Sequence, residues 1–234
     1  MLQRSEGTVL DIRFADCAVR FGDKTALFPL NLTLTERRIG IIGLNGSGKT
    51  TFARLINGLV KPSGGKVLLG GLDTVTDEKQ VFGKAGFIFQ NPQHQLIMPI
   101  VEEDIAFGLK NRGLKGAEIT ERTAAILARF GISHLARRRV HELSGGETQL
   151  VAMASVLVTE PDILILDEPT NQLDLKNRAL VARTIDGLEQ QVLVISHDLS
   201  LVEDFERVLL FHGGRLAGDG APGEIIARYR ELAA

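Results

Sequence analysis

The segment IGIIGLNGSGKTT, residues 39–51, constrains the fold more than any other part of this 234-residue chain. Its aliphatic start is typical of a buried strand, and the glycines that follow prevent that strand from continuing. The next residues, TTFARLINGL, have a helical pattern. A strand, a glycine-rich turn and a helix in direct succession are the context in which the pattern G-x-x-x-x-G-K-[ST] has structural meaning.

This loop predicts a phosphate-binding site. Glycines allow backbone N–H groups to converge on a phosphate chain, and the helix N-terminus adds positive potential. We expect Lys49 to reach the β- and γ-phosphates of a nucleotide and Thr50 to offer its hydroxyl to Mg²⁺. The alternative is a glycine-rich turn without a ligand. The loop residues predicted to bind the nucleotide are Asn45, Gly46, Ser47, Gly48, Lys49, Thr50 and Thr51.

Two later strand ends carry side chains suited to the same chemistry. In DILILDEP the apolar run is followed by Asp167 and Glu168, and in QVLVISHD the apolar run is followed closely by His197. Parallel strands would bring these ends to one edge of a sheet, beside the phosphate loop. We therefore predict that Asp167 binds Mg²⁺, that Glu168 is the general base for an attacking water, and that His197 bonds the γ-phosphate. The alternatives are an ordinary acidic strand end and a structural histidine, and spacing alone does not separate the two roles of His197.

The periodicity along the chain predicts an α/β fold. Period-two runs in the first third, TVLDIRF, LNLTLT and GKVLLGG, indicate short antiparallel strands. Residues 100–158 have helical spacing and suggest a helical insert. The buried runs DILILD and QVLVIS, with LKNRALVARTIDGL between them, alternate as in a parallel sheet. VLLFHGG and GRLAGDG predict a hairpin, and GEIIARYRELAA a closing helix.

Composition excludes several classes of protein. Cys17 is the single cysteine, so no internal disulfide forms, and residues 1–14 lack the apolar stretch of a secretory signal. We therefore expect the protein to work in a reducing cytoplasm. No window approaches the roughly 20 apolar residues that cross a bilayer. A net charge of −2 with interspersed signs gives no case for nucleic-acid binding, and we interpret Arg137–Arg139 as a solvated surface.

The order of motifs resembles the ATP-binding-cassette ATPase family over essentially the whole chain. The phosphate loop is followed by LSGGE at 143–147, then ILILDEPT, NQLD and ISHD. The resemblance implies a P-loop NTPase (RecA-like) parallel-sheet core with an N-terminal antiparallel β subdomain and an inserted α-helical subdomain. It also implies one cassette domain over residues 1–234, with the nucleotide-binding core at 1–90 and 159–234 and the helical subdomain at 91–158.

The resemblance further implies that the cassette works as a dimer around two ATP molecules. A helix N-terminus with a serine cap is an anion site, which suits contact with the γ-phosphate of ATP on the opposite subunit. The signature residues assigned to that contact are Ser144, Gly145, Gly146 and Glu147. Glutamine is commoner than Glu147 in the family, and Leu150 stands where arginine is frequent. We expect the ATPase site to be active, and the sequence does not predict its catalytic rate.

Three other positions take their roles from the resemblance. Gln90 matches the glutamine that approaches Mg²⁺, and Asp174 matches the loop that crosses the dimer interface. Phe21 matches the aromatic residue that stacks on adenine; the alternative is a core phenylalanine.

The segment FQNPQHQLIMPIVEEDIAFGLKNRGL, residues 89–114, is similar to the ATPases of energy-coupling-factor importers. The similarity implies a transmembrane coupling protein and a small substrate-binding membrane protein as partners, at the cytoplasmic face of the cell membrane. Gln93, Gln95 and Met98 are candidates for the groove that receives the coupling protein. The alternative is that LIMPI packs inside the helical block and that EED is a solvated face, and we expect both to be partly true.

The cargo and the pairing are harder to predict. The chain stops soon after GEIIARYRELAA, and SGGETQL with NQLDL is similar to compact biotin-type ATPases, so we favour biotin over cobalt, nickel or another vitamin. A homodimer and a pair with a paralogue both remain open. Two other classes compete: a soluble cassette ATPase that acts on DNA, ribosomes or a protein assembly, and a small-molecule kinase.

Overall fold

The computed structural model describes residues 9–233, which form two compact units. The first unit contains residues 9–86, Asp162–Glu168 and residues 189–233; the second contains Phe87–Pro161 and Pro169–Leu188. Residues 1–8 and 234 lie outside the described residues, and so does most of the segment in which we looked for a secretory signal. Within residues 9–233, no helix has both the length and the apolar character needed to cross a membrane.

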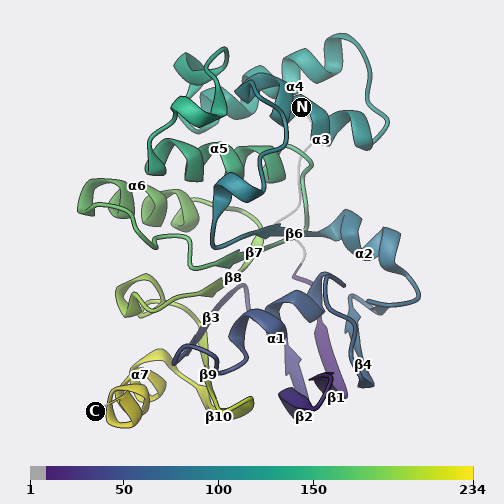
Figure 1. Ribbon diagram of the computed structural model, residues 1–234, viewed down its shortest axis with the longest axis vertical. Coiled ribbons are helices and arrows are strands. Elements are labelled where there is room, and N and C mark those ends of the chain that lie inside the picture. The colour runs from purple at the N-terminus through teal and green to yellow at the C-terminus, as the bar shows by residue number, and fades with distance from the viewer. Residues whose placement is uncertain (1–8, 234) are drawn as a thin grey trace. The chain divides into compact units, whose positions relative to one another are not determined.

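Two sheets form the frame of the first unit (Figure 1). The four-stranded sheet has the order β2-β1-β4-β5 with antiparallel pairs throughout. Its strands are β1 (Ile12–Phe21), β2 (Lys24–Leu34), β4 (Gly64–Leu69) and β5 (Leu72–Asp73).

The second sheet has the order β10-β9-β3-β8-β7-β6. In it, β3 pairs in parallel with β8 and β9, β7 pairs in parallel with β8, and β9 with β10 is the antiparallel hairpin that the sequence predicts. The boundary between the two units falls within β6. The strands are β3 (Arg38–Gly43), β6 (Ala85–Ile88), β7 (Ile163–Asp167), β8 (Gln191–Ile195), β9 (Arg207–His212) and β10 (Arg215–Gly220).

Helices make up the regular structure of the second unit apart from the end of β6, and three of them lie between β6 and β7 in the chain as predicted. These are α3 (Val101–Asn111), α4 (Ala117–Arg129) and α5 (Gly145–Leu157), and α6 (Leu175–Asp186) follows β7. Figure 1 shows α5 and α6 side by side, and the two helices are in contact. The first unit contains α1 (Lys49–Ile56), α2 (Glu78–Lys84) and α7 (Pro222–Ala233).

A column of three phenylalanines joins the two sheets of the first unit. Phe52 on α1 stacks on Phe14 of β1 with ring centroids 4.5 Å apart, and its other neighbour is Phe211 of β9 at 4.8 Å. Phe52 and Phe211 are fully buried. Aromatic pairs at these distances add to the stabilisation from apolar burial. The helix that follows the phosphate loop is therefore fixed between both sheets.

The first strand differs from its predicted extent. The alternating pattern of TVLDIRF predicts a strand that ends at Phe14, whereas β1 continues to Phe21. Asp16 has a positive φ of 48°, and the pairing with β2 shifts register between Phe14 and Cys17. A bulge of this kind interrupts the period of two, which is why the pattern ended early. Cys17 beyond the bulge is buried, and burial raises the pKa of its thiol to about 11.

The prediction also missed α2. Only Val81 of its seven residues is buried, and Phe82 is 63% exposed. A short, largely polar helix has too few apolar positions to produce a helical period, so it left no signal in the sequence.

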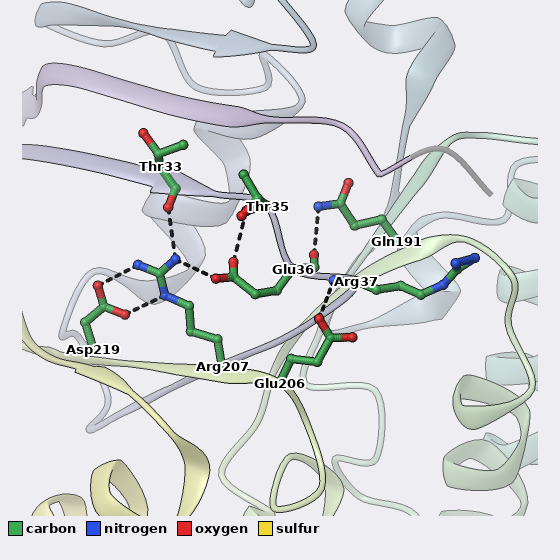
Figure 2. Close-up of polar contacts among 8 residues, drawn as sticks. All are labelled: Thr33, Thr35, Glu36, Arg37, Gln191, Glu206, Arg207 and Asp219. Carbon is green, nitrogen blue, oxygen red and sulfur yellow. Dashed lines mark hydrogen bonds and ion pairs between the residues drawn. The ribbon is translucent and has the colours of Figure 1, made fainter. Parts of the chain in front are cut away.

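An arginine in the first unit ties the antiparallel sheet to the second sheet (Figure 2). Arg207 at the start of β9 binds Asp219 of β10 through two hydrogen bonds, of 2.6 Å from Nε and 2.7 Å from Nη2. Its Nη1 donates to Glu36 Oε1 at 2.9 Å and to the carbonyl oxygen of Thr33 at 3.0 Å. Thr33 belongs to β2, and Glu36 lies between β2 and β3. The guanidinium therefore links strands of both sheets.

The charges of this network reinforce one another. The bond to Asp219 is the largest cause that raises the pKa of Arg207 above its ordinary value, and the bond to Glu36 adds to it. The side chain of Arg207 is 19% exposed, so water screens these bonds only partly. Two neighbouring hydrogen bonds fix the segment between β2 and β3 to the second sheet (Figure 2). The Arg37 N–H donates to Glu206, and the Gln191 side chain donates to the carbonyl oxygen of Glu36.

We predict that Arg207→Gln lowers the free energy of unfolding by about 2 to 3 kcal/mol, because it leaves two partly buried carboxylates without their cation. Urea denaturation followed by circular dichroism measures the change. Arg13→Gln is the matched control: its 3.8 Å ion pair with Asp11 is more than half exposed, and its loss should cost less than about 0.5 kcal/mol. Equal effects of the two substitutions would contradict the role assigned to Arg207.

Candidate nucleotide-binding site

The turn between β3 and α1 has a backbone that only glycine adopts without strain at two positions. Gly43 has a φ of 144° and Gly48 a φ of 103°. A Cβ on Gly43 would collide with the carbonyl oxygen of Phe211, and one on Gly48 would lie 2.9 Å from that of Ala26. Gly48 is the N-cap of α1 and supplies no side-chain cap. The first N–H groups of α1 are thus offered to a ligand rather than to a capping side chain.

Lys49 is the cation of this loop. Its ammonium donates to the carbonyl oxygen of Gly43 at 2.7 Å and to that of Leu44 at 3.0 Å, and the residue is only 6% exposed. Burial lowers the pKa of Lys49, while the charges of Glu168 and Asp167 act in the opposite direction. A buried ammonium beside a ring of backbone N–H groups is suited to a phosphate chain.

Asp167 meets the phosphate loop directly. It is 1% exposed at the end of β7 and accepts a 3.2 Å hydrogen bond from the Thr50 hydroxyl. Burial raises the pKa of the Asp167 carboxyl, against the effects of the Thr50 bond and the charges of Arg54 and Lys49. A cation at this point would favour the ionised carboxylate.

Glu168 and His197 form the third part of the site. The backbone N–H of His197 donates to Glu168 Oε2 at 3.1 Å, and the ring Nε2 lies 3.1 Å from Oε1. Nε2 also lies 3.0 Å from the side-chain oxygen of Asn45. Glu168 is 8% exposed, and its Oε1 is buried without a hydrogen-bond donor. Nε2 therefore has hydrogen-bond geometry toward Asn45 but not toward Glu168.

Burial has opposite effects on these two groups. It raises the pKa of Glu168, although the bond from the His197 N–H and the charge of Lys49 oppose that rise. It lowers the pKa of His197, and Lys49 lowers it further. The result is a neutral imidazole beside a carboxyl group of increased proton affinity, a pairing suited to acid–base chemistry.

The donor set also fits a hard cation. Thr50 and Asp167 supply a hydroxyl and a buried carboxylate at bonding distance from each other. The part of the chain from residue 9 to residue 233 has no cluster of three or more His, Cys, Asp or Glu side chains that could hold a metal alone. A cation here would take its other ligands from phosphate oxygens and water, which is how Mg²⁺ is usually bound with nucleotides.

The signature segment lies in the second unit, at the start of α5. Ser144 is its N-cap and forms a capping box with Glu147: the Ser144 N–H donates to Glu147 Oε2 at 2.8 Å, and the Glu147 N–H donates to Ser144 Oγ at 3.4 Å. Both hydrogen bonds order the first turn of the helix. Leu150 is buried in the same helix.

Asn177 on α6 supports this turn and was not predicted from the sequence. A Cβ on Gly146 would collide with the Asn177 side chain, so glycine is required for the close approach. Asn177 also bonds both carboxylate oxygens of Asp174, at 2.8 Å through its N–H and 3.1 Å through Nδ2. One side chain thus lies against the signature and holds the loop that contains Asp174.

The arginine cluster has a neighbour that the sequence did not reveal. Arg137–Arg139 are exposed as predicted, but Arg138 Nη1 lies 3.7 Å from Glu147 Oε1 and its Nη2 donates to the carbonyl oxygen of Glu142 at 3.0 Å. Arg138 therefore offsets the charge that distinguishes Glu147 from glutamine.

The remaining predicted residues are placed as follows. Phe21 ends β1 and is 56% exposed, so it is not a core phenylalanine. Gln90 and Gln93 are exposed in the second unit, Met98 is half-buried, and the Gln95 side chain accepts the Phe89 N–H at 3.1 Å.

Both parts of the alternative for residues 96–104 hold in part, as expected. The acidic face is exposed at Glu102 and Glu103, but Asp104 is buried and accepts the N–H groups of Ile97 and Met98 at 2.7 and 2.9 Å. A buried carboxylate must be paired with donors, and these two backbone groups supply them. The LIMPI segment is not wholly packed either, since Ile97 is 69% exposed.

The fold and the first-unit site define a P-loop nucleotide-hydrolase: a glycine-rich turn before a helix, with a carboxylate pair and a histidine at neighbouring parallel strand ends. The model of the ABC transporter family matches residues 27–171. The chain belongs to this family, and it is an ATPase with an ABC-type α/β fold, as the motifs predicted.

Individual relatives agree with this assignment. The biotin transport ATP-binding protein BioM of Rhizobium etli is 63% identical over 96% of this chain and 100% of its own length. The energy-coupling factor transporter ATP-binding protein EcfA of Methanothermobacter thermautotrophicus is 39% identical over 92% of this chain and 72% of its own. The structure of cbiO1 from Clostridium perfringens, part of the ABC transporter complex cbiONQ, matches with a TM-score of 0.83 and 31% identity, over 95% of this chain and 92% of that one.

We predict a pH-dependent difference between the parent and Glu147→Gln. The bond from the Ser144 N–H is the main cause that lowers the pKa of Glu147. The ionised side chain therefore stabilises the folded state above the ordinary pKa of 4.5, and this contribution is lost as the pH falls through the lower folded value. Urea denaturation should show the parent more stable at neutral pH by about 0.5 to 1 kcal/mol.

Glu147→Ala is the companion variant. It removes the acceptor for the Ser144 N–H altogether and should cost about 1 kcal/mol at neutral pH. A difference between parent and Glu147→Gln that stays constant down to acid pH would show that the charge of Glu147 is not what stabilises this turn.

Proposed function

We propose that this chain is the ATP-hydrolysing subunit of an energy-coupling-factor type importer, and that biotin is its cargo. The identity of 63% with BioM of Rhizobium etli, over the full length of that relative, carries the proposal. A biotin transport ATP-binding protein of Rhodobacter capsulatus, 45% identical, adds support. The EcfA relative and the cbiO1 structure support the importer class. Cobalt, nickel or another vitamin is the alternative cargo.

In this role the chain works at the cytoplasmic face of the cell membrane as a peripheral protein. Its partners are a second ABC ATPase subunit, identical or related, a transmembrane coupling protein and a substrate-binding membrane protein; nucleic acid is not among them. Gln93, Gln95 and Met98 are the residues that we assign to the coupling groove. The exposed Ile97 in the same segment supports an apolar contact there.

We keep the proposed division into a nucleotide-binding core, residues 1–90 and 159–234, and a helical subdomain, residues 91–158. The compact units place α6 with the helices α3–α5 rather than with the strands, and so divide the chain at slightly different points. In the proposed division α6 belongs to the core because it connects two core strands.

ATP is the substrate of the first-unit site. The loop residues Asn45–Thr51 surround its phosphates, and Phe21 stacks on adenine. Mg²⁺, when bound, neutralises the phosphate charge, and Thr50, Asp167 and Gln90 are the chain's ligands for it. Lys49 exchanges its bonds with two loop carbonyl oxygens for bonds with phosphate oxygens.

Hydrolysis requires a base and a residue that senses the γ-phosphate. Glu168 is the proposed base: Oε2 is held by the His197 N–H, which leaves Oε1 to accept a proton from water. His197 presents Nε2–H to the γ-phosphate. Ser144–Glu147 and Asp174 contribute to the ATP of a second subunit, so a dimer encloses two ATP molecules and opens after hydrolysis.

We expect Lys49→Ala and Glu168→Gln to separate ATP binding from hydrolysis. Lys49→Ala should weaken ATP binding about 10- to 100-fold, because it removes a charge-assisted bond. Glu168→Gln should retain binding and lose kcat by at least about 100-fold. It should also accumulate as an ATP-bound dimer in analytical ultracentrifugation.

The controls for these variants are Lys79→Ala and Glu203→Gln, which alter exposed side chains of the first unit. Both should bind and hydrolyse ATP like the parent. Hydrolysis at the parental rate by Glu168→Gln would refute the base, and a Glu168→Gln chain that stays monomeric with ATP at high concentration would refute the shared site.

The cargo is tested through the partners. We expect affinity isolation of the tagged chain from detergent-treated membranes, followed by mass spectrometry, to recover two membrane proteins. Vesicles are loaded with ATP and contain the purified complex with its ATPase subunits facing the lumen. They should take up labelled biotin, and vesicles with the Glu168→Gln complex should not. Uptake of cobalt, nickel or another vitamin instead would show that biotin is the wrong cargo. Recovery of soluble partners alone would refute the importer proposal.

A further inference from the structure

The ring of His197 lies between two oxygen atoms. Nε2 is 3.0 Å from the Asn45 side-chain oxygen and 3.1 Å from Glu168 Oε1. A ring nitrogen without a proton would direct its lone pair at two acceptors, which is unfavourable, so Nε2 carries the proton. A neutral imidazole has one N–H, and that proton can be directed at only one of the two oxygens.

The proton is directed at Asn45. The contact between Nε2 and the Asn45 oxygen has hydrogen-bond geometry, whereas Glu168 Oε1 is buried and has no donor in spite of the similar distance. A buried acceptor without a donor is costly and is found mainly where function requires it. A carboxylate oxygen of this kind keeps its full capacity to accept a proton.

We propose that Asn45 is a positioning residue whose side-chain carbonyl holds the Nε2 proton of His197 and so keeps it from Glu168. The inference rests on the proposed roles of Glu168 and His197 in hydrolysis. In those roles a γ-phosphate oxygen takes the place of the Asn45 carbonyl as acceptor for the same N–H. The ring then needs no change of tautomer when ATP arrives.

A competing hydrogen bond, from the His197 ring to Glu168, explains why the Asn45 acceptor is useful. A bond from the His197 ring to the Glu168 carboxylate would be charge-assisted and about twice as strong as a bond to a neutral amide. Once formed, it would occupy the oxygen that must accept a proton from water, and it would have to break before hydrolysis. Asn45 supplies an alternative acceptor that a phosphate can displace.

Nitrogen NMR of histidine-labelled, nucleotide-free protein tests the geometry without any catalysis. The signals of His197 are assigned by their loss in His197→Gln. In the parent, we expect a neutral ring with its proton on Nε2. Asn45→Leu, of similar size but without an acceptor, should move the Nε2–H signal downfield as the proton turns to Glu168. The double variant Asn45→Leu/Glu168→Gln should reverse that shift.

Steady-state hydrolysis supplies the second readout. Asn45→Leu should lower kcat about tenfold, since the loss corresponds to one bond that must break before the chemical step. Its KM should rise as well, because Asn45 lies in the loop that surrounds the phosphates. Asn111→Leu, at an exposed position on α3, is the control and should match the parent in both experiments.

Three results would overturn the inference. They are a parent ring with its proton on Nδ1, an Nε2–H signal that Asn45→Leu leaves unchanged, and a raised KM with unchanged kcat, which would make Asn45 an ATP contact alone. A failure of the proposed function has a different signature: Glu168→Gln would hydrolyse ATP at the parental rate while the NMR shifts of the Asn45 variants persisted.

Discussion

The parallel register of β3, β8 and β7 is the constraint on which the first-unit site depends. Ile41 of β3 and Asp167 of β7 are both level with Ile195 of β8. Gly43 ends β3 two residues after Ile41, and His197 lies two residues beyond the end of β8. Backbone hydrogen bonds thus fix the phosphate loop, the carboxylate pair and the histidine at one edge of the sheet, and a shift of one strand by one residue would turn these side chains to the wrong face.

The electrostatics of that edge suit a ligand with many negative charges and a cation. Lys49, Asp167 and Glu168 are all less than a tenth exposed, and burial disfavours the charged form of each. The loop carbonyl oxygens accept from Lys49, the Thr50 hydroxyl donates to Asp167, and the His197 N–H donates to one oxygen of Glu168. A nucleotide with its metal ion exchanges such bonds for stronger ones, so the site has its charges in place before binding and little reorganisation remains.

The signature turn of the second unit, which we propose as a separate anion site, is ordered by other means. This turn depends on a capping box rather than on glycine-rich backbone, and on the approach of Asn177 to Gly146. Asn177 also fixes Asp174, so the two segments that the family uses between subunits are held by one residue. The unusual Glu147 keeps the capping hydrogen bond that glutamine would make, and Arg138 offsets its charge.

The sequence by itself determined the α/β class, the phosphate loop and the strand ends with Asp167, Glu168 and His197, because these depend on local glycine chemistry and on burial patterns that the chain shows directly. It did not reveal the continuation of β1 beyond its bulge, the short helix α2 or the buried Asp104. Only the tertiary structure decided that His197 Nε2 lies at hydrogen-bond distance from Asn45 and that Asn177 supports the signature. Those contacts join residues 152 and 31 positions apart. No local pattern records a long-range pairing; the packing of the elements creates it.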